Sequence, residues 1–344
     1  MNITMNQLPT RTWNRLSMNE ARVSLEGTFE NVKPLVLAQP KGCSFTEMGQ
    51  DLGIRGELSS IMEDVAPCAA QSQGQMEEAL VLHYHLQKGQ ALAKLCLEAP
   101  DHTHLKAVVV LTSENQGTFA LQTEVKVGVN ARAELYVAEL LDPGARCLNH
   151  IAAHCDAQGK FSLVRLELGA KQLYSGVNVD LEGRESEFTS DIGYHVAEGQ
   201  TMDMNYVSTH RGEKTNCTME ISGTLEEKAC KTFRGTIDFQ RGCAGAKGSE
   251  NENVLLMAEE CVNQTLPVIL CQEEDVEGSH GASIGQLDDK VLFYLGSRGI
   301  SQEEARRIMA EARIQAVCAK FPSELAQDLI HSYEAGRGDS HGEL

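Results

Sequence analysis

The sequence contains no long apolar run, and this absence excludes two classes of protein. No window approaches the roughly 18 consecutive apolar residues that a membrane-spanning helix needs. The first residues, MNITMNQLPTRTWNRL, lack the apolar core of a secretory signal. We therefore expect a chain that stays in the cytoplasm.

Closely spaced cysteine pairs are also missing. The chain has eleven cysteines, an odd number, and no CxxC pair. A secreted disulfide framework is typically even in number and found in a shorter chain, so reduced thiols fit better. Most of the cysteines are expected to be small buried hydrophobes, most clearly Cys96 and Cys318, which lie inside apolar runs.

Positive charge is scarce. Lys and Arg number 30 against 49 Asp and Glu, which gives a formal net charge of −19. Nucleic acids and anionic membrane surfaces attract basic proteins, so we expect neither among the partners of this chain.

Nucleotide and hydrolase motifs are absent as well. Residues 242–249, GCAGAKGS, contain glycine and lysine but do not match the phosphate-binding pattern GxxxxGK[ST], and there is no GxSxG or HExxH. We expect no ATP site and no enzymatic activity. The paired ligands His83 and His85, His102 and His104, and His154 and Cys155 fall short of the three or four that a metal site needs.

The centre of the chain, residues 77–286, has the pattern of many short strands. Apolar residues alternate with polar ones in short runs. These runs are Val125–Val127, Val164–Leu168, Val177–Leu181, Met202–Tyr206, Met219–Ile221 and Ile237–Phe239. Turn residues bound them, at Gly128–Asn130, Asp156–Gly159, Glu182–Gly183, Glu198–Gly199, Gly212 and Gly223. The pattern predicts strands of about five residues.

Three architectures satisfy such a run of strands: a sandwich, a barrel and a β-helix. The strands are too numerous for one sandwich. A solenoid buries one face of each strand against its neighbours, although the sequence shows no strict repeat. Periodicity favours a mainly β fold with a β-helix core and leaves the other two open.

Helical patterns flank this body. Residues 1–76 form a mixed segment, with short helices expected at Ser17–Ala21 and Thr46–Met62 and a polar linker at Ala69–Gln75. Residues 287–335 form a helical domain, and residues 336–344 a disordered tail.

Three helices are expected in the helical domain. Asp288 and Asp289 cap the first, Gly299 ends it, and Ser301 with Glu304 forms a capping box for the second. The side chains expected to face inward on the second and third helices are Ala305, Ile308, Met309, Ala312, Ala316, Leu325, Ala326 and Leu329.

The stretch from Leu255 to Ile300 combines sulfur, imidazole and carboxylates. Cys261 and Cys271 are an even number of residues apart, so an extended segment directs both thiols to one face. A turn at Gly278–Gly281 then places His280 at the exit of that strand. Such ligands suit iron or zinc.

Four motifs in this stretch resemble the SufB/SufD family, the scaffold subunits of the SUF iron–sulfur cluster assembly machinery. The motifs are Ser279-His280-Gly281-Ala282, Ile284-Gly285-Gln286-Leu287-Asp288, Leu292-Phe293-Tyr294-Leu295 and Ser297-Arg298-Gly299-Ile300. The resemblance continues more thinly at Phe233-Arg234-Gly235, Arg241-Gly242, Thr12-Trp13-Asn14 and Met18-Asn19.

The resemblance implies a right-handed parallel β-helix and a set of partners. These are a SufC-type ABC ATPase, a second SufB/SufD-type subunit in a homodimer or heterodimer, and a cysteine desulfurase or sulfur carrier. A transient Fe–S cluster is the implied cargo, and a reduced flavin is a further option. The residues implied to dock the ATPase are Leu292, Phe293, Tyr294, Arg298, Gly299 and Ile300.

The resemblance also implies roles for individual residues. Cys261 and Cys271 match SufB cysteines, which makes both sulfur acceptors, and His280 matches a SufD histidine at the subunit interface. SufB carries a metal-ligating glutamate where this chain has Gly281. Glu277 or Glu273 is the substitute considered, so the implied metal ligands are Cys261, His280 and Glu277.

Two other functions stay open at this point. A structural partner would stabilise a true scaffold and bind no cluster. A β-helix enzyme acting on polysaccharide would need an export signal and a groove of Asp with Lys or Arg, and the sequence shows neither. The residues also leave open whether the role is SufB-like or SufD-like.

Overall fold

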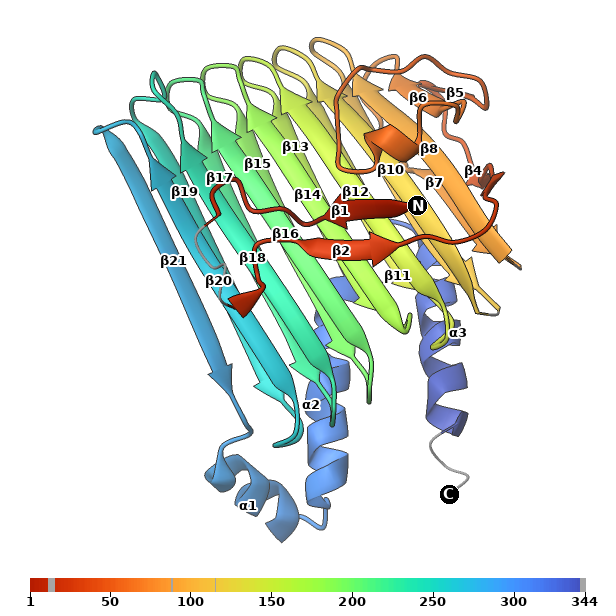
Figure 1. Ribbon diagram of the computed structural model, residues 1–344, viewed down its shortest axis with the longest axis vertical. Coiled ribbons are helices and arrows are strands. Elements are labelled where there is room, and N and C mark those ends of the chain that lie inside the picture. Colours follow the sequence, from red (N-terminus) through yellow and green to blue (C-terminus); the bar gives the residue numbers. More distant parts are fainter. Residues whose placement is uncertain (12–15, 88, 115, 341–344) are drawn as a thin grey trace.

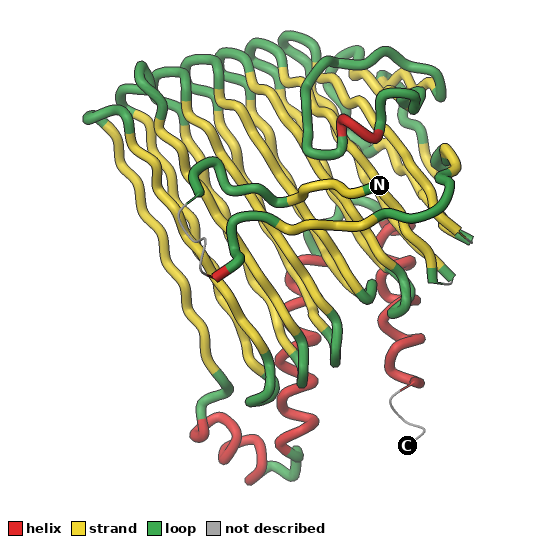
Figure 2. Tube along the Cα trace, viewed as in Figure 1, coloured by secondary structure: helices red, strands yellow, loops and turns green. Residues whose placement is uncertain are grey.

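The body of the chain is a parallel β-helix of two facing sheets (Figures 1 and 2). The computed structural model describes residues 1–11, 16–87, 89–114 and 116–340. From β6 to β21 the chain alternates between the sheets, because even-numbered strands lie in one and odd-numbered strands in the other. Each strand from β8 to β19 pairs in parallel with the strand two positions later in the chain. The prediction of a mainly β, parallel β-helix protein is confirmed.

The even sheet contains β5 (Cys43–Thr46), β6 (Cys68–Ser72), β8 (Gly89–Ala99), β10 (Gly117–Val127), β12 (Arg146–Cys155), β14 (Gln172–Leu181), β16 (Thr201–His210), β18 (Cys230–Phe239) and β20 (Val262–Cys271), and β3 (Glu30–Asn31) pairs with β8. The odd sheet contains β4 (Leu35–Ala38), β7 (Leu80–Leu86), β9 (His104–Ser113), β11 (Arg132–Leu140), β13 (Lys160–Leu168), β15 (Glu187–Val196), β17 (Asn216–Leu225), β19 (Ala246–Leu256) and β21 (Val276–Gly285).

Most of these strands are nine to eleven residues long, so the expected length of about five was wrong. The alternation of apolar and polar residues stops before the strand does, because polar side chains also occupy inward positions. In β13, Arg165 and Glu167 are fully buried and form an ion pair of 3.0 Å inside the solenoid.

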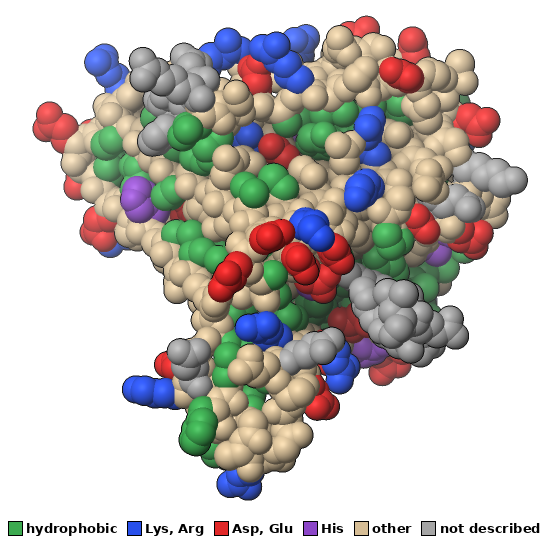
Figure 3. All heavy atoms as spheres, turned by 60° about the horizontal axis from the view of Figure 1, so that its bottom comes forward, with side chains coloured by type: hydrophobic (Ala, Val, Ile, Leu, Met, Phe, Trp, Pro, Cys, Tyr) green, Lys and Arg blue, Asp and Glu red, His purple; other side chains and the backbone are tan. Residues whose placement is uncertain are grey.

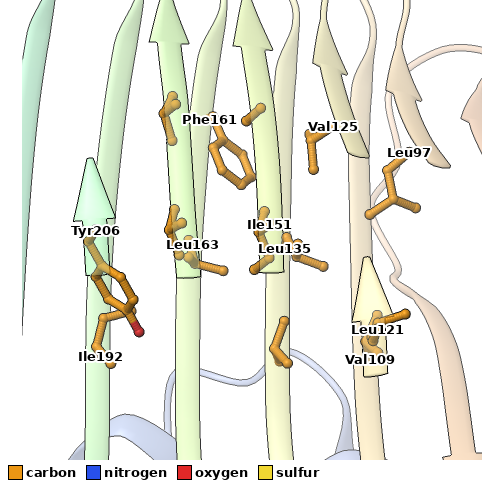
Figure 4. Close-up of a cluster of buried hydrophobic side chains, with 14 of the residues drawn as sticks. Leu97, Val109, Leu121, Val125, Leu135, Ile151, Phe161, Leu163, Ile192 and Tyr206 are labelled. Atoms are coloured by element: carbon orange, nitrogen blue, oxygen red, sulfur yellow. The ribbon is translucent and has the colours of Figure 1, made fainter. Parts of the chain in front are cut away.

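Apolar side chains from both sheets fill the interior (Figure 4). Phe161 and Phe188, on neighbouring strands β13 and β15, stack with ring centroids 5.5 Å apart. Leu121 of β10 and Leu135 of β11 point from opposite sheets into the interior between them. Full burial of one such side chain stabilises the fold by about 1.5–3 kcal/mol, so this layer provides the main driving force for folding.

The turns lie where glycine, asparagine and aspartate predicted them, with one exception. Asn130 and Lys214 adopt the left-handed conformation at two of these turns. Gly223 was expected at a turn but lies inside β17. A Cβ atom there would come within 2.1 Å of the Tyr194 ring, so this glycine makes room for a buried aromatic side chain.

The N-terminal segment is a strap, not a helical lead-in. Strands β1 (Asn2–Met5) and β2 (Ala21–Ser24) pair in an antiparallel fashion and lie across the outer face of the even sheet (Figure 1). The helices expected at Ser17–Ala21 and Thr46–Met62 are replaced by extended chain and one short 3-10 turn, Ser59–Ile61. The expected linker instead contributes residues 69–72 to β6.

Arg234 anchors the strap. Its Nη1 donates to Asp203 Oδ1 at 2.7 Å and its Nε to the carbonyl oxygen of Met18 at 2.5 Å. Asn6 Nδ2 donates to the same carboxylate at 2.6 Å. Within one motif, Phe233 therefore packs into the interior while Arg234 binds the strap outside. Trp13 lies outside the described residues.

Three helices follow β21: α1 (Asp289–Ser297), α2 (Gln302–Cys318) and α3 (Glu324–Ser340). The capping predictions are confirmed, because Asp288 accepts from Lys290 N and Ser301 accepts from Glu304 N. Gly299 ends α1 with a φ of +87°. Helices α2 and α3 contact the outer face of the odd sheet, α2 over β13 to β17 and α3 over β11.

The buried face of α2 differs from the one expected. The expected stripe is exposed at Ile308, Ala312 and Ala316. The buried side chains are Ala305, Ala310, Ile314, Val317 and Cys318. Alanines on both faces made the apolar stripe ambiguous, and the larger Ile314 and Val317 bury more area against the sheet.

In α3, Ala326 and Ile330 are buried while Leu325 is exposed, so the inward placement of Leu325 was wrong. The helix continues to Ser340, into the segment expected to be disordered, and residues 341–344 lie outside the described part. None of the described helices has the length and apolar character to cross a membrane.

Candidate functional site

The last coil, formed by β20 and β21, leaves one side of each strand without a neighbour. β20 pairs with β18 and β21 with β19, and both strands stand last in their sheets. In the part of the chain that the structure describes, no further strand pairs with either. Open strand edges expose backbone N–H and C=O groups that can pair with another chain.

The accessible thiols gather at this end of the solenoid. Cys230 and Cys261 are partly exposed and Cys271 is exposed, whereas the other eight cysteines are buried, Cys96 and Cys318 among them as predicted. Cys230 begins β18 and is in register with Val262, the residue after Cys261. Sequence reasoning missed Cys230, and the turn signal at Lys228–Ala229 could have placed it at a strand start.

Cys261 immediately precedes β20, and Cys271 is the last residue of that strand. Ten residues of extended chain span about 33 Å, so the two thiols do not act at one point of a single chain. Cys271 is in register with the inward-facing Phe239, and Cys261 packs against the same interior cluster. Their common face is therefore as expected, although the distance separates them.

The two thiols differ in environment. Cys261 Sγ donates to the carbonyl oxygen of Ala258 at 3.2 Å, and burial raises the pKa of this thiol. Because the thiolate is the nucleophile and the metal ligand, Cys261 must lose a proton before it can react. Cys271 Sγ donates to the carbonyl oxygen of Glu273 at 3.0 Å on the surface.

His280 lies in the middle of a strand. The turn expected at Gly278–Gly281 is part of β21, which continues to Gly285. His280 is in register with Glu250 of β19. A Cβ atom on Gly278 would lie 3.0 Å from the Phe239 ring and 3.3 Å from Ile269, so alternate residues from Gly278, His280 included, face the interior.

The position of His280 along the coil follows from Glu250. A Cβ atom on Gly235 of β18 would lie 2.5 Å from Glu250 Oε2, so this carboxyl group rests on Gly235. Gly235 is in register with Pro267 of β20. His280 is thus level with Pro267, about 20 Å along the strand from Cys261 and about 13 Å from Cys271.

Glu277 and Glu273, the acidic residues considered as ligands beside His280, already have hydrogen-bond partners elsewhere. Glu277 Oε1 accepts from Lys247 Nζ at 2.9 Å on the outer face of β21, opposite to His280. Glu273 Oε2 accepts from the backbone N–H of Gly242, and such bonds lower the pKa of Glu273. Among the described residues of one chain, no three His, Cys, Asp or Glu side chains are placed to hold a metal ion. The ligands Cys261, His280 and Glu277 stay a prediction that needs a second chain.

A buried polar group lies beneath His280 and was missed by sequence reasoning. Glu252 accepts from Lys231 Nζ, from Thr265 Oγ1 at 2.6 Å and from Tyr194 at 3.0 Å. Glu250 beside it is 1% exposed, and its Oε1 has no hydrogen-bond partner. Burial, and next the charge of Glu252, raises the pKa of Glu250 to about 8. The sequence signal was carboxylates at alternate positions of an inward-facing strand, Glu250-Asn251-Glu252.

Helix α1 extends beyond the end of β21 (Figure 1). Some of its large apolar side chains are exposed to solvent. Phe293 is 80% and Tyr294 57% exposed, and the Arg298 guanidinium lies over the Tyr294 ring at 5.5 Å. Leu292 is buried and holds the helix in place. Figure 3 brings this end of the molecule forward, with hydrophobic, acidic and basic side chains interspersed. Because β20 ends where β21 begins, Cys261 and α1 lie at the same end of the coil.

Comparison with known proteins gives consistent matches. The family described as "SUF system FeS cluster assembly, SufBD core domain" matches residues 84–313, which is 230 of the 344 residues. The iron–sulfur cluster assembly protein SufD of Bacillus subtilis is 26% identical over 243 residues, covering 66% of this chain and 53% of that protein. SufBD family proteins of Staphylococcus saprophyticus and Staphylococcus aureus are 25% and 26% identical, each covering 50% of this chain and 37% of the relative.

The chain thus spans about half of the B. subtilis relative, and less of the staphylococcal ones. The matched region begins in β7 and ends in α2, so it contains the strands of both sheets from β8 to β21, the last coil included. The N-terminal strap lies outside it.

Proposed function

The chain belongs to the SufBD family of the SUF iron–sulfur cluster assembly system, and from this premise we propose that it is a scaffold subunit holding a nascent Fe–S cluster at a subunit interface. The observation that carries the proposal is the last coil, where an open strand edge coincides with the accessible thiols and His280. Thiolate and imidazole are ligands that bind iron. Cytoplasmic location and the absence of enzymatic activity remain predictions.

A second chain completes the site in this proposal. The ligands of one chain lie about 13–20 Å apart along the coil, so no single cluster joins them. A second SufB/SufD-type subunit, pairing with the open edges of β20 and β21, brings a second set of thiols and a second imidazole to the seam. The proposal is compatible with either a homodimer or a heterodimer.

Sulfur enters through Cys261 or Cys271 in this mechanism. The thiolate attacks the outer sulfur of a persulfide on a desulfurase or carrier. One S–S bond forms, one breaks and the donor thiolate leaves, so the step needs no external oxidant. Burial raises the pKa of Cys261 and so lowers the fraction of thiolate, and a partner or a bound metal that displaces the proton would favour the attack. Whether a reduced flavin supplies electrons is a separate question.

The exposed side chains of α1 form the proposed dock for a SufC-type ATPase. Phe293, Tyr294 and Arg298 offer an aromatic and cationic patch of the kind that dominates protein interfaces. The patch lies at the Cys261 end of the last coil. ATP-driven dimerisation of two docked ATPases would pull the scaffolds apart and expose the seam, a two-state change biased by nucleotide.

Anaerobic reconstitution tests the proposal. The full chain, with iron and sulfide added, is expected to develop the visible absorbance of an Fe–S cluster. Cys261→Ser should abolish that absorbance and leave capture of the ATPase intact, because Cys261 is not one of the α1 residues proposed to dock the ATPase. An unchanged iron and sulfide content in Cys261→Ser would remove this thiol from the mechanism.

The second candidate function is a structural partner that binds no cluster. It is favoured by the separation of the candidate ligands, since no three of the described ones meet in one chain. A colourless chain that still captures the ATPase and a second subunit would select it. Membership of the SufBD family lends no support to an enzyme acting on polysaccharide.

A further inference from the structure

We infer that Glu250, and not Glu277, is the carboxylate that joins His280 in a divalent-cation site inside the open end of the solenoid. The cation chemistry that fits is ferrous iron or an ion of similar preference, such as cobalt. The inference deepens the proposed scaffold function and rests on it for its biological role. Its geometry comes from the last coil alone.

The two side chains share one face of the odd sheet. Glu250 and His280 are register partners on the parallel strands β19 and β21, whose backbones lie about 4.8 Å apart. Both face the interior: Glu250 is buried there, and Gly278 shows that its alternate neighbours in β21 point the same way. Glu277 faces outward and already accepts from Lys247.

Space for the carboxylate is built into the opposite sheet. A Cβ atom on Gly235 would come within 2.5 Å of Glu250 Oε2 and 2.6 Å of its carboxyl carbon, so only glycine leaves room for this side chain as it lies. Gly235 belongs to the Phe233-Arg234-Gly235 motif. Within this motif, Gly235 therefore leaves room for the Glu250 carboxylate, and Arg234 binds the N-terminal strap.

Glu250 lacks the partners that its burial demands. Its Oε1 is buried without any hydrogen bond, and Lys231, the nearest cation, bonds to Glu252 and Thr265 instead. A buried, unpaired carboxylate costs the fold several kcal/mol. A bound cation removes this cost by satisfying the unpartnered oxygen.

Imidazole and carboxylate together suit ferrous iron. One chain supplies two ligands. The open edge of β21 allows a second chain to approach, and two copies would supply two imidazoles and two carboxylates. Ligands from one chain alone leave positions for water, so a single chain should bind the cation more weakly than a pair.

Anaerobic titration of the full-length chain with Co²⁺, followed by its visible absorbance and by paramagnetic broadening of the His280 imidazole resonances, tests the inference. Glu250→Gln is expected to weaken Co²⁺ binding at least tenfold and to remove the broadening at His280. Glu277→Gln is the matched control on the same coil and should titrate like the unmodified chain. Equal affinity in Glu250→Gln, or no broadening at His280 in the unmodified chain, overturns the inference.

A second variant covers the case in which Glu250→Gln fails to fold, judged by circular dichroism. Glu250→Asp keeps the charge and shortens the side chain by one methylene, so an intermediate Co²⁺ affinity is expected, and unchanged affinity again overturns the inference. The two proposals fail separately. If Glu250→Gln loads an Fe–S cluster like the unmodified chain, the inference fails and the scaffold stands. If Co²⁺ binds through Glu250 and no cluster ever forms, the scaffold fails and the cation site stands.

Discussion

Thiol exposure divides the eleven cysteines at the scale of single residues. The eight buried ones are inert as long as the chain is folded, and burial raises the pKa of several of them, with Cys43 and Cys243 each reaching about 11. Cys230, Cys261 and Cys271 remain for reaction. Their reactivity depends on how much of each exists as thiolate.

Brief alkylation of the native chain at pH 7 should therefore label one cysteine first. Cys271 is exposed and is expected to react fastest, with Cys261 and Cys230 several-fold slower because burial raises the pKa of both thiols. Peptide mass spectrometry over time gives the order, with the urea-unfolded chain as the control in which all eleven react. Early labelling of Cys217 would contradict the burial of this thiol.

Glu250 gives the folded chain a pH dependence of defined sign. Its pKa is raised from 4.5 to about 8, so the folded state binds a proton more tightly than the unfolded state. Its contribution to stability is fully present below about pH 4.5 and is lost as pH rises through about 8. We expect unfolding in urea, with a metal chelator present, to become easier by a few kcal/mol between pH 5 and pH 9.

In Glu250→Gln, the free energy of unfolding should change less between pH 5 and pH 9, because only the remaining titratable groups then contribute. The neighbouring charges are Glu252 and Lys231, which are bonded to each other and unaltered in this variant. A variant that loses stability between pH 5 and pH 9 as steeply as the unmodified chain would assign the effect to other groups.

Some single-residue environments could be predicted from the sequence and others could not. The burial of Cys96 and Cys318 followed from their apolar neighbours. Glu250 could not be found in this way, because its environment is made by Gly235, fifteen positions earlier and on the other sheet. The same holds for Gly223, whose missing side chain makes room for Tyr194 and not for a turn.

At the scale of elements, the ends of α1 are set by capping residues close in sequence, and its outer face is exposed. Asp288, Gly299 and Ser301 fix where the helices begin and end, and these signals act within one turn, so the sequence predicted them. Which face of α2 is buried depends on the distant strands β13 to β17, so the sequence did not reveal it.

Phe293→Ala should impair capture of a SufC-type ATPase at least tenfold, because exposed aromatic side chains are frequent anchors of interfaces. Phe293 is 80% exposed, so the stability of the chain itself should change little. Surface plasmon resonance with the immobilised chain measures the affinity. Leu325→Ala, which removes an apolar side chain that is 48% exposed on α3, is the matched control. If Phe293→Ala and Leu325→Ala bind the ATPase with equal affinity, the exposed face of α1 is not the docking site.

Element β21 was misread for a related reason. Two glycines around Ser279 and His280 are typical of a turn, yet Gly278 lies against Phe239 and Ile269 of the facing sheet. In sequence, a glycine that allows a turn looks the same as a glycine inside a strand that makes room for a bulky side chain. Only the register with β19 separates the two.

For the molecule as a whole, alternation and turn residues were sufficient to predict that the body consists of strands, but not how many strands there are or how the coils stack. The interior polar residues Arg165 and Glu167 break the apolar pattern in β13, which made this strand appear about half its length. The family resemblance supplied the solenoid, because no sequence repeat marks the coils. The strap was missed, since it is held by Arg234, a contact of 216 residues in separation.

The two ends of the solenoid are built differently. At the N-terminal end, β4 pairs with β7 and β5 with β6 in an antiparallel fashion, and these short strands interrupt the parallel stack. At the C-terminal end, β20 and β21 are full-length parallel strands that carry the exposed apolar residues Val262 and Ile284. Long exposed edges favour pairing with another chain, so the C-terminal end is the one expected to form the dimer seam.

A charge placed on that edge should therefore separate the subunits. Ile284→Lys is expected to convert the proposed dimer into monomers in light scattering after gel filtration, because an edge lysine opposes strand addition. Ile284 is 46% exposed, so the fold itself has little to lose. Leu35→Lys on β4, at 62% exposure, introduces the same charge at the other end and should leave the dimer intact. If Leu35→Lys separates the subunits and Ile284→Lys does not, the seam lies at the N-terminal end, and the thiols and His280 of the last coil then face solvent instead of a partner.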